Sequence, residues 1–195
     1  LPVISESLKK AGYVTALFGK VHSFFPPGNW PHMTEINQEH CLYIQQKGFD
    51  EVLVARNFNH LGSNYSTPDT VINTGKPMNK TLTEHAVKFI DENTECPFFL
   101  YLSYILPHEP YKAMEDLIAE FENKPPSDRL KVKNPTYAAM LAMLDQSVNN
   151  ILTALKESGL ENNTLIIFTS DNGAPAKVYD GNINIPLRGT KGQFY

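Results

Sequence analysis

The sequence predicts an α/β fold with a mainly parallel sheet flanked by helices, and two patterns lead to this prediction. Three short apolar runs have the length and composition of strands that are buried on both faces. Amphipathic segments with the period of a helix alternate with these runs, as is typical of a largely parallel sheet. The three runs cover residues 13–18, 97–105 and 164–169.

The first third of the chain predicts few regular elements. A short helix is expected over 2–11, where Gly12 ends it, and the first strand follows at 13–18. From residue 24 to about residue 80, Pro, Gly, Asn and His recur throughout. We therefore expect a long irregular region with at most short elements, a kind of segment that often carries functional sites.

The remainder of the chain is more regular. A helix is predicted over about 81–93, a further amphipathic stretch over 111–121, and a long helix over about 136–156 that Gly159 caps. The apolar face of the first helix comprises Leu82, Ala86, Phe89 and Ile90. The apolar face of the long helix comprises Tyr137, Met140, Leu141, Leu144, Val148, Ile151, Leu152 and Leu155.

Size and charge restrict the function classes. The chain has 195 residues, enough for one sizeable domain or part of a larger one, and its formal net charge is −4. This negative net charge argues against nonspecific electrostatic binding to nucleic acid or to an anionic membrane, although it permits a local cationic pocket. No apolar run reaches the roughly 18–20 residues that span a bilayer. The two cysteines, Cys41 and Cys96, do not define a disulfide framework in a chain of this length.

A polar cluster follows each of the three predicted strands. Ligands of open α/β sheets bind beyond the carboxyl ends of the strands, and parallel strands would bring these clusters to one edge of the sheet. Together the clusters supply cations, imidazoles and hard oxygen atoms, which suit an anionic ester with a metal ion. They are Gly19-Lys20-Val21-His22, Pro107-His108-Glu109-Pro110 and Ser170-Asp171-Asn172-Gly173.

Single residues of these clusters also have ordinary structural explanations. Lys20 and His22 point to one side if the backbone is extended, which would suit anion binding and proton transfer, but they also fit a surface loop. Asp171 and Asn172 offer two oxygen ligands, whereas Ca²⁺ takes about 6–8, so further ligands would be needed. Lys191 lies in a loop bracketed by glycines that could approach a ligand closely.

Five motifs in order along the chain resemble those of the sulfatase family within the alkaline-phosphatase superfamily. Each motif alone is modest, but their order and spacing make the resemblance specific. The motifs are LKKAGYVTALFGKVH at 8–22, KGFDE at 47–51, CPFFLY leading to PHEP over 96–110, NTLIIFTSDNG at 163–173 and PLRGTKG at 186–192.

The resemblance implies an alkaline-phosphatase-like fold and a sulfuric ester hydrolase. It implies that Lys20, His108 and Lys191 bind the sulfate oxygens or assist the leaving group. It further implies that His22 acts on the hydrate of a formylglycine nucleophile. The two residues that match metal ligands, usually for Ca²⁺, are Asp171 and Asn172.

Parts of the family pattern are absent from this sequence. Neither Cys41, followed by Leu-Tyr-Ile-Gln, nor Cys96, followed by Pro-Phe-Phe-Leu, fits the C-x-[PS]-x-R signature of the formylglycine precursor. The paired aspartates that complete the family's metal site are also absent, and Val21 replaces the usual Trp. We therefore expect residues 1–195 to be a single incomplete catalytic domain, with the nucleophile segment and a C-terminal part outside it. By themselves, these residues are expected to be inactive.

The resemblance implies a small-molecule or glycan sulfate ester as the substrate, with no nucleic acid partner and no membrane segment in this stretch. A secreted, lysosomal or periplasmic location is expected from the family. Two alternatives stay open. One is a phosphate or phosphonate ester hydrolase of the same superfamily. The other is a non-catalytic α/β binding protein, in which Lys20, His108, Asp171 and Lys191 would be scattered.

Overall fold

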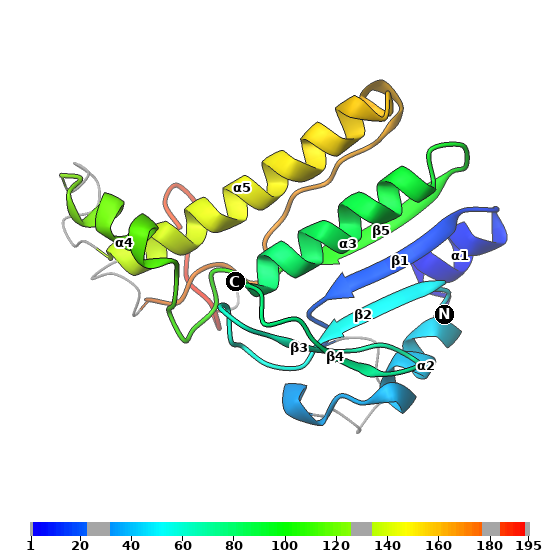
Figure 1. Cartoon of the computed structure of the whole chain (residues 1–195), viewed down its shortest axis with the longest axis horizontal. Coiled ribbons are helices and arrows are strands. Elements are labelled where there is room, and N and C mark those ends of the chain that lie inside the picture. The colour runs from blue at the N-terminus through cyan, green and yellow to red at the C-terminus, as the bar shows by residue number, and fades with distance from the viewer. Residues whose placement is uncertain (1, 23–31, 126–133, 177–183, 194–195) are drawn as a thin grey trace.

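The computed structural model describes residues 2–22, 32–125, 134–176 and 184–193 (Figure 1). A sheet in the order β4-β3-β2-β1-β5 forms the centre of the fold. The central strand β1 pairs in parallel with β2 and β5, while the short strands β3 and β4 extend the sheet in antiparallel fashion. The strands are β1 (Val14–Gly19), β2 (Glu51–Ala55), β3 (Asn64–Ser66), β4 (Val71–Asn73) and β5 (Phe98–Ser103).

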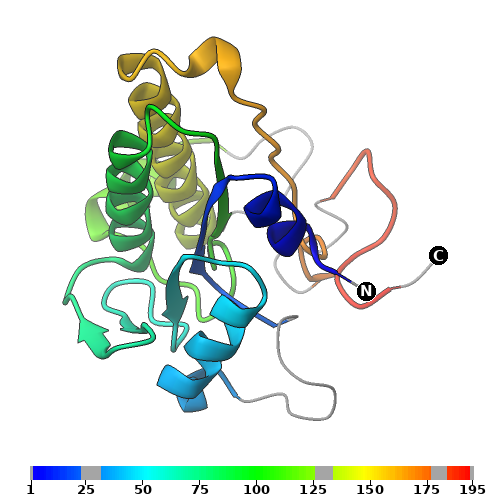
Figure 2. The same ribbon diagram turned by 90° about the vertical axis from the view of Figure 1, so that its right-hand side faces the viewer.

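Helices cover both faces of this sheet. Figure 2 shows α3 and α5 side by side on one face and α1 on the other. The predicted α/β class is confirmed, and the sheet is mixed because β3 and β4 are antiparallel. The helices are α1 (Ile4–Lys10), α2 (Gln38–Gln46), α3 (Met78–Glu92), α4 (Glu115–Glu122) and α5 (Pro135–Glu157), with short 3-10 turns η1 (Met33–Glu35) and η2 (Glu161–Asn163).

The region predicted to be irregular holds more structure than expected. It contains α2, β2 and the β3–β4 hairpin, whereas residues 23–31 lie outside the described part of the chain. Tertiary packing explains the difference, because Cys41 and Ile44 of α2 are fully buried against the main core. In the described part of this region, the Pro and Gly residues therefore lie in short connections between elements.

The main core is built around β1. Phe18 is buried against α3, where its ring meets that of Phe89 edge-on at a centroid distance of 6.0 Å. The predicted apolar face of α3 is confirmed, since all four of its residues are buried. The predicted face of α5 is partly wrong: Leu141 and Leu152 are 43% and 42% exposed. The apolar stripe of α5 is wider than its contacts with α3 and α4, so its margins reach solvent.

The third predicted strand, 164–169, does not form in the structure. The segment has no ladder partner among the described residues, and β5 is the last strand on its side of the sheet. Its apolar side chains are consequently open to solvent, with Leu165 86% and Ile167 78% exposed. An apolar run predicts burial, but a strand also requires a neighbouring strand that pairs with it.

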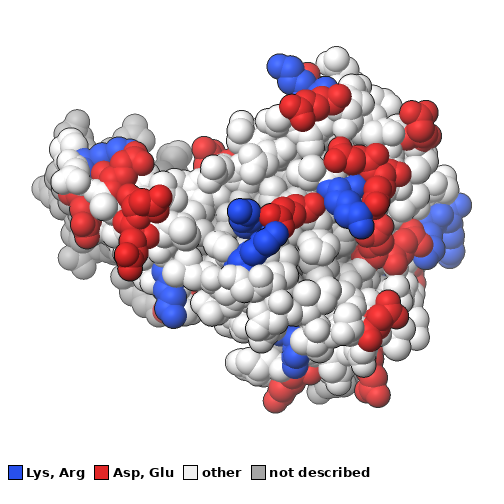
Figure 3. Space-filling model, in the orientation of Figure 1, with Lys and Arg blue, Asp and Glu red and all other residues white. Residues whose placement is uncertain are grey.

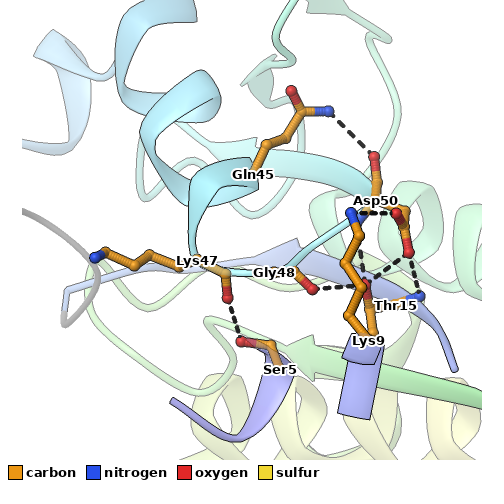
Figure 4. Close-up of polar contacts among 7 residues, drawn as sticks. All are labelled: Ser5, Lys9, Thr15, Gln45, Lys47, Gly48 and Asp50. Atoms are coloured by element: carbon orange, nitrogen blue, oxygen red, sulfur yellow. Dashed lines mark hydrogen bonds and ion pairs between the residues drawn. The ribbon is translucent and has the colours of Figure 1, made fainter. Parts of the chain in front are cut away.

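The KGFDE motif holds the amino end of the sheet together (Figure 4). The hydroxyl of Thr15, at the start of β1, lies 2.7 Å from the carbonyl oxygen of Gly48, and the Asp50 carboxylate accepts hydrogen bonds from the backbone N–H and hydroxyl of Thr15. Lys9 of α1 forms an ion pair with Asp50. These contacts join α1, β1 and the α2–β2 connection at the end of β1 opposite Lys20, so the motif is structural here.

Replacement of Asp50 by asparagine is expected to destabilise the protein by about 1–2 kcal/mol at pH 7, since charged hydrogen bonds contribute about 1.5–3 kcal/mol and solvent screens this partly exposed group. Burial acts to raise the pKa of Asp50, but its bonds to Lys9 and Thr15 outweigh burial and lower the pKa. Because the pKa of Asp50 is lower in the folded state than in the unfolded state, its ionised carboxylate stabilises the folded protein at pH values above the unfolded-state pKa. This stabilisation is lost as the pH falls through the folded-state pKa.

The difference in the free energy of unfolding between wild type and Asp50→Asn should therefore be largest at neutral pH. It should shrink below about pH 4, near the unfolded-state pKa of an aspartate. Urea unfolding at several pH values measures it. A difference that is constant between pH 7 and pH 2.5 would show that the charge of Asp50 contributes nothing.

Candidate active site

The first cluster, Lys20 and His22, follows directly from the end of β1. Gly19 has φ 120°, and a Cβ atom there would lie only 1.9 Å from the carbonyl oxygen of Ser103 on β5. The N–H of Lys20 donates to that same oxygen at 2.9 Å. This close approach of the two strand ends places the Lys20 side chain, which is 13% exposed, at the carboxyl edge of the sheet.

The cluster at 170–173 meets Lys20 at this edge. Lys20 Nζ lies 3.6 Å from Asp171 Oδ2, and the side-chain amide of Asn172 donates to the same carboxylate oxygen at 2.9 Å. The Asp171 side chain is 67% exposed, so its oxygens remain accessible. The predicted juxtaposition of Lys20 with the Asp171–Asn172 pair therefore occurs, although the strand that was expected to carry this pair is absent from the described structure.

His108 and Lys191 form a second contact between distant parts of the chain. His108 Nδ1 lies 2.6 Å from the carbonyl oxygen of Glu109, and His108 Nε2 lies 3.3 Å from Lys191 Nζ. Because a carbonyl oxygen only accepts hydrogen bonds, the proton of a neutral His108 is assigned to Nδ1. Its Nε2 then accepts a hydrogen bond from the Lys191 ammonium group.

His22 links the two contacts electrostatically. Its pKa is lowered, first by partial burial and then by the positive charge of Lys20, while Asp171 opposes the shift; His108 and Lys191 lower the pKa further. The charged groups of both contacts are thus close enough to His22 to affect its pKa. The imidazole of His22 is consequently neutral near pH 7, the form that can accept a proton.

Asn184 connects the loop of Asp171 with the loop of Lys191. Its side-chain oxygen accepts from the N–H of Ala174 at 2.9 Å, and its side-chain amide donates to the carbonyl oxygens of Ala174 and Gly189 at 3.1 and 3.0 Å. The N–H of Lys191 also donates to Ala174 O at 3.1 Å. No sequence pattern had singled out Asn184, because its role depends on partners in two loops.

Two further residues around His108 were also missed. The ring of Phe58 stacks on His108 with a centroid distance of 4.5 Å and an interplanar angle of 19°. His60 Nε2 lies 2.6 Å from the carbonyl oxygen of His108. The sequence gives no sign of this contact, since His60 and His108 are 48 positions apart. In contrast, His32, His40 and His85 form hydrogen bonds with residues of their own turn or helix.

The donor atoms of Asp171 and Asn172 suit a hard cation, but they are too few for a complete site. Within the described ranges, no group of three or more His, Cys, Asp and Glu side chains could hold a metal ion. A Ca²⁺ ion takes about 6–8 oxygen ligands. Asp171 and Asn172 could therefore supply only two of the ligands that such a site requires, and their role as metal ligands stays a prediction.

The molecular surface shows no broad cationic region on the face seen in Figure 3, where basic and acidic side chains are interspersed. Acidic side chains gather over α4, which contains four of them. Among the described residues, no helix is both long and apolar enough for a membrane span. The positive charges of the site therefore come from single side chains, Lys20 after the end of β1 and Lys191 in the loop that contacts His108.

A family model described as Sulfatase matches residues 1–194. The chain belongs to the sulfatase family. It is 30% identical over 212 residues to the uncharacterised sulfatase YdeN of Escherichia coli, which covers 96% of this chain and 35% of that protein. It is also 28% identical over 204 residues to the endo-4-O-sulfatase of Bacteroides thetaiotaomicron, and this alignment covers 87% of the present chain and 39% of the relative.

Two solved structures share the fold. Ps i-CgsB, crystallised in complex with k-i-k-neocarrahexaose, is 29% identical and superimposes with a TM-score of 0.70, covering 98% of this chain and 44% of its own. The putative sulfatase yidJ of Bacteroides fragilis has a TM-score of 0.72 at 21% identity, which supports the fold alone. The sulfatase-family chain described here thus spans less than half the length of these relatives, and its alkaline-phosphatase-like fold is confirmed.

Proposed function

We propose that this chain forms the sulfate-binding part of the active site of a sulfuric ester hydrolase. The observation that carries the proposal is the meeting of two cation-containing pairs, Lys20 with Asp171 and His108 with Lys191, at the carboxyl edge of the sheet. The alternative of a non-catalytic binding protein predicted that these residues are scattered, whereas Lys20 and Asp171, 151 positions apart, form an ion pair, and His108 and Lys191, 83 positions apart, are in contact. Membership of the sulfatase family supports the proposal.

In this proposal Lys20 and Lys191 donate hydrogen bonds to the oxygens of the sulfuryl group. Charge develops on these oxygens and on the leaving oxygen during transfer, and fixed cations in a partly enclosed site stabilise that charge. The Lys191–His108 pair lies in direct contact, so together they can supply a proton to the leaving oxygen. His22, neutral near pH 7, serves as the proton acceptor on the side of the nucleophile.

Asp171 and Asn172 are proposed to contribute two oxygen ligands to a Ca²⁺ ion, whose charge would help to neutralise the sulfate ester. The remaining ligands and the formylglycine nucleophile would come from outside the residues described here. Residues 1–195 are accordingly proposed to be one incomplete catalytic domain, and a glycan or small-molecule sulfate ester is the proposed substrate.

The test is hydrolysis by the full-length protein, measured as inorganic sulfate released from an aryl sulfate and from sulfated oligosaccharides. We expect release from at least one of these, loss of activity on treatment with EDTA, and recovery with Ca²⁺. The matching phosphate monoester is assayed in parallel. Faster hydrolysis of the phosphate ester, with recovery by Zn²⁺ but not Ca²⁺, would replace this proposal by a phosphate ester hydrolase.

A further inference from the structure

The connection between β2 and β3, residues 56–63, is a compact loop that borders the candidate site. The N–H of Arg56 donates to the carbonyl oxygen of Asn64 at 2.9 Å and closes the base of the loop. Inside it, the Ser63 hydroxyl donates to the carbonyl oxygen of Asn59. The N–H of Met78 donates to the carbonyl oxygen of His60 at 2.9 Å and fixes the loop to the start of α3. The loop is therefore held on two sides.

Two side chains of this loop contact His108 in different ways. The ring of Phe58, which also packs against the main core, covers a face of the His108 imidazole. His60 Nε2 lies within hydrogen-bond distance of the backbone carbonyl oxygen of His108, so it must be the protonated nitrogen and donate that bond. One side chain thus restrains the ring of His108 and the other restrains its backbone.

The environment of His60 indicates that this bond is its main polar interaction. The residue is fully buried, and its Nδ1 has no hydrogen-bond partner among the described residues. A buried ring nitrogen without a partner costs about 1–3 kcal/mol. Burial lowers the pKa of His60, against the opposing effect of its bond to His108, so the ring stays neutral and keeps a single donor. An apolar side chain would fill this space without that cost but could not bind the His108 carbonyl.

We propose that Phe58 and His60 are positioning residues that hold His108 in the orientation in which its Nε2 faces Lys191 and the substrate. The inference rests on the proposed function of His108. Three contacts thus restrain His108: the carbonyl oxygen of Glu109 accepts a hydrogen bond from Nδ1, the ring of Phe58 stacks on the imidazole, and His60 donates to the backbone carbonyl oxygen. Neither Phe58 nor His60 needs to touch the substrate for this role.

Kinetics of the full-length protein test the role. Phe58→Leu and His60→Leu are each expected to lower kcat for sulfate ester hydrolysis by about 10- to 100-fold with little change in KM, since misplacing a catalytic group by about 1 Å can cost about 100-fold. Phe58→Tyr keeps the stacked ring, and His60→Gln keeps a donor near the position of Nε2, so both should recover most of the lost kcat.

A double-mutant cycle separates positioning from general damage. If Phe58 acts only through His108, then Phe58→Leu combined with His108→Ala should be no slower than His108→Ala alone. Phe99→Leu is the matched control, because Phe99 also stacks on an aromatic ring, that of Phe49, but lies at the opposite end of β5 from the His108 loop. Multiplicative effects of Phe58→Leu and His108→Ala, or an equal loss of kcat in Phe99→Leu, would overturn the inference.

A spectroscopic readout makes the test independent of activity. In protein labelled at the Cε1 carbon of histidine, the His108 signal is identified by its loss in His108→Ala and should be shifted by the ring current of Phe58. We expect this shift to disappear in Phe58→Leu and the signal to broaden or divide in His60→Leu. An unchanged His108 signal in both folded variants would overturn the inference, even if the protein proved to be a sulfatase.

Discussion

Replacement of Lys191 by alanine in the full-length protein is expected to lower kcat/KM for sulfate ester hydrolysis by about 100- to 1000-fold, the loss that follows removal of one donor to a developing negative charge. The Lys191 ammonium lies 3.3 Å from His108 Nε2, so its removal takes away a cation and also the hydrogen bond that orients the imidazole. Most of the loss should fall on kcat, because the charge on the leaving oxygen is greatest in the transition state.

Lys88→Ala is the matched control, because Lys88 is an exposed helical lysine in an i, i+4 pair with Glu92. Its removal should leave kcat/KM within a factor of about two, since such surface pairs contribute only about 0.3–0.5 kcal/mol. Initial rates over a range of ester concentrations give kcat and KM for both variants. A Lys191→Ala variant that keeps a third or more of the wild-type kcat/KM would exclude Lys191 from the chemistry.

Gly19→Ala is expected to destabilise the protein by about 2–6 kcal/mol, combining about 1–3 kcal/mol of backbone strain with about 1–3 kcal/mol of overpacking. Gly19 has φ 120°, and an added Cβ would lie 1.9 Å from the carbonyl oxygen of Ser103. That atom belongs to the backbone of β5 and cannot rotate away. Either β1 and β5 would separate at their carboxyl ends, or the chain would fail to fold.

Gly12 provides the control for this prediction. It also has a positive φ, 90°, but an added Cβ would meet nothing within 4 Å. Gly12→Ala should therefore show the backbone strain alone, about 1–3 kcal/mol. Unfolding in urea, followed by circular dichroism, compares the two variants. Equal destabilisation of both would mean that the approach of Gly19 to Ser103 is of no energetic consequence.

Local patterns predicted the elements that are stabilised by local periodicity and deep burial. The apolar face of α3 and the strand β1 follow directly from the sequence, because all four face residues of α3 and five of the six residues of β1 are buried. Strand β5 was also predicted, although it is only partly covered and Tyr101 is 44% exposed. The exposed run at 164–169 shows the limit of this reasoning. Its composition is that of a buried strand, but composition does not specify which strand lies beside it.

The sequence predicted that Lys20 and Asp171 lie close together, but the structure brings them together in a way that differs in part from the expected one. Parallel strands were expected to carry all three clusters to one edge, and β1 and β5 do so for Lys20 and for the loop of His108. Asp171 reaches Lys20 from an extended segment without strand pairing, and Asn184 ties its loop to that of Lys191. Contacts of this kind join side chains with distant backbone atoms and leave no periodic pattern in the sequence.

The same reasoning explains why Phe58 and His60 were missed. An aromatic residue and a histidine two positions apart in a Gly- and Asn-containing loop are unremarkable in the sequence, and their partner is about 50 positions away. Only the folded position of the β2–β3 connection beside the β5 end gives them a role. Their effect on His108 is therefore a property of the tertiary structure.

The most direct measurement is a crystal structure of the full-length protein with a sulfate monoester or inorganic sulfate bound. The account predicts that Lys20 Nζ, His108 Nε2 and Lys191 Nζ all lie within about 2.7–3.2 Å of oxygens of a single sulfate group. Sulfate bound away from the end of β1, or in contact with only one of these three nitrogens, would contradict it.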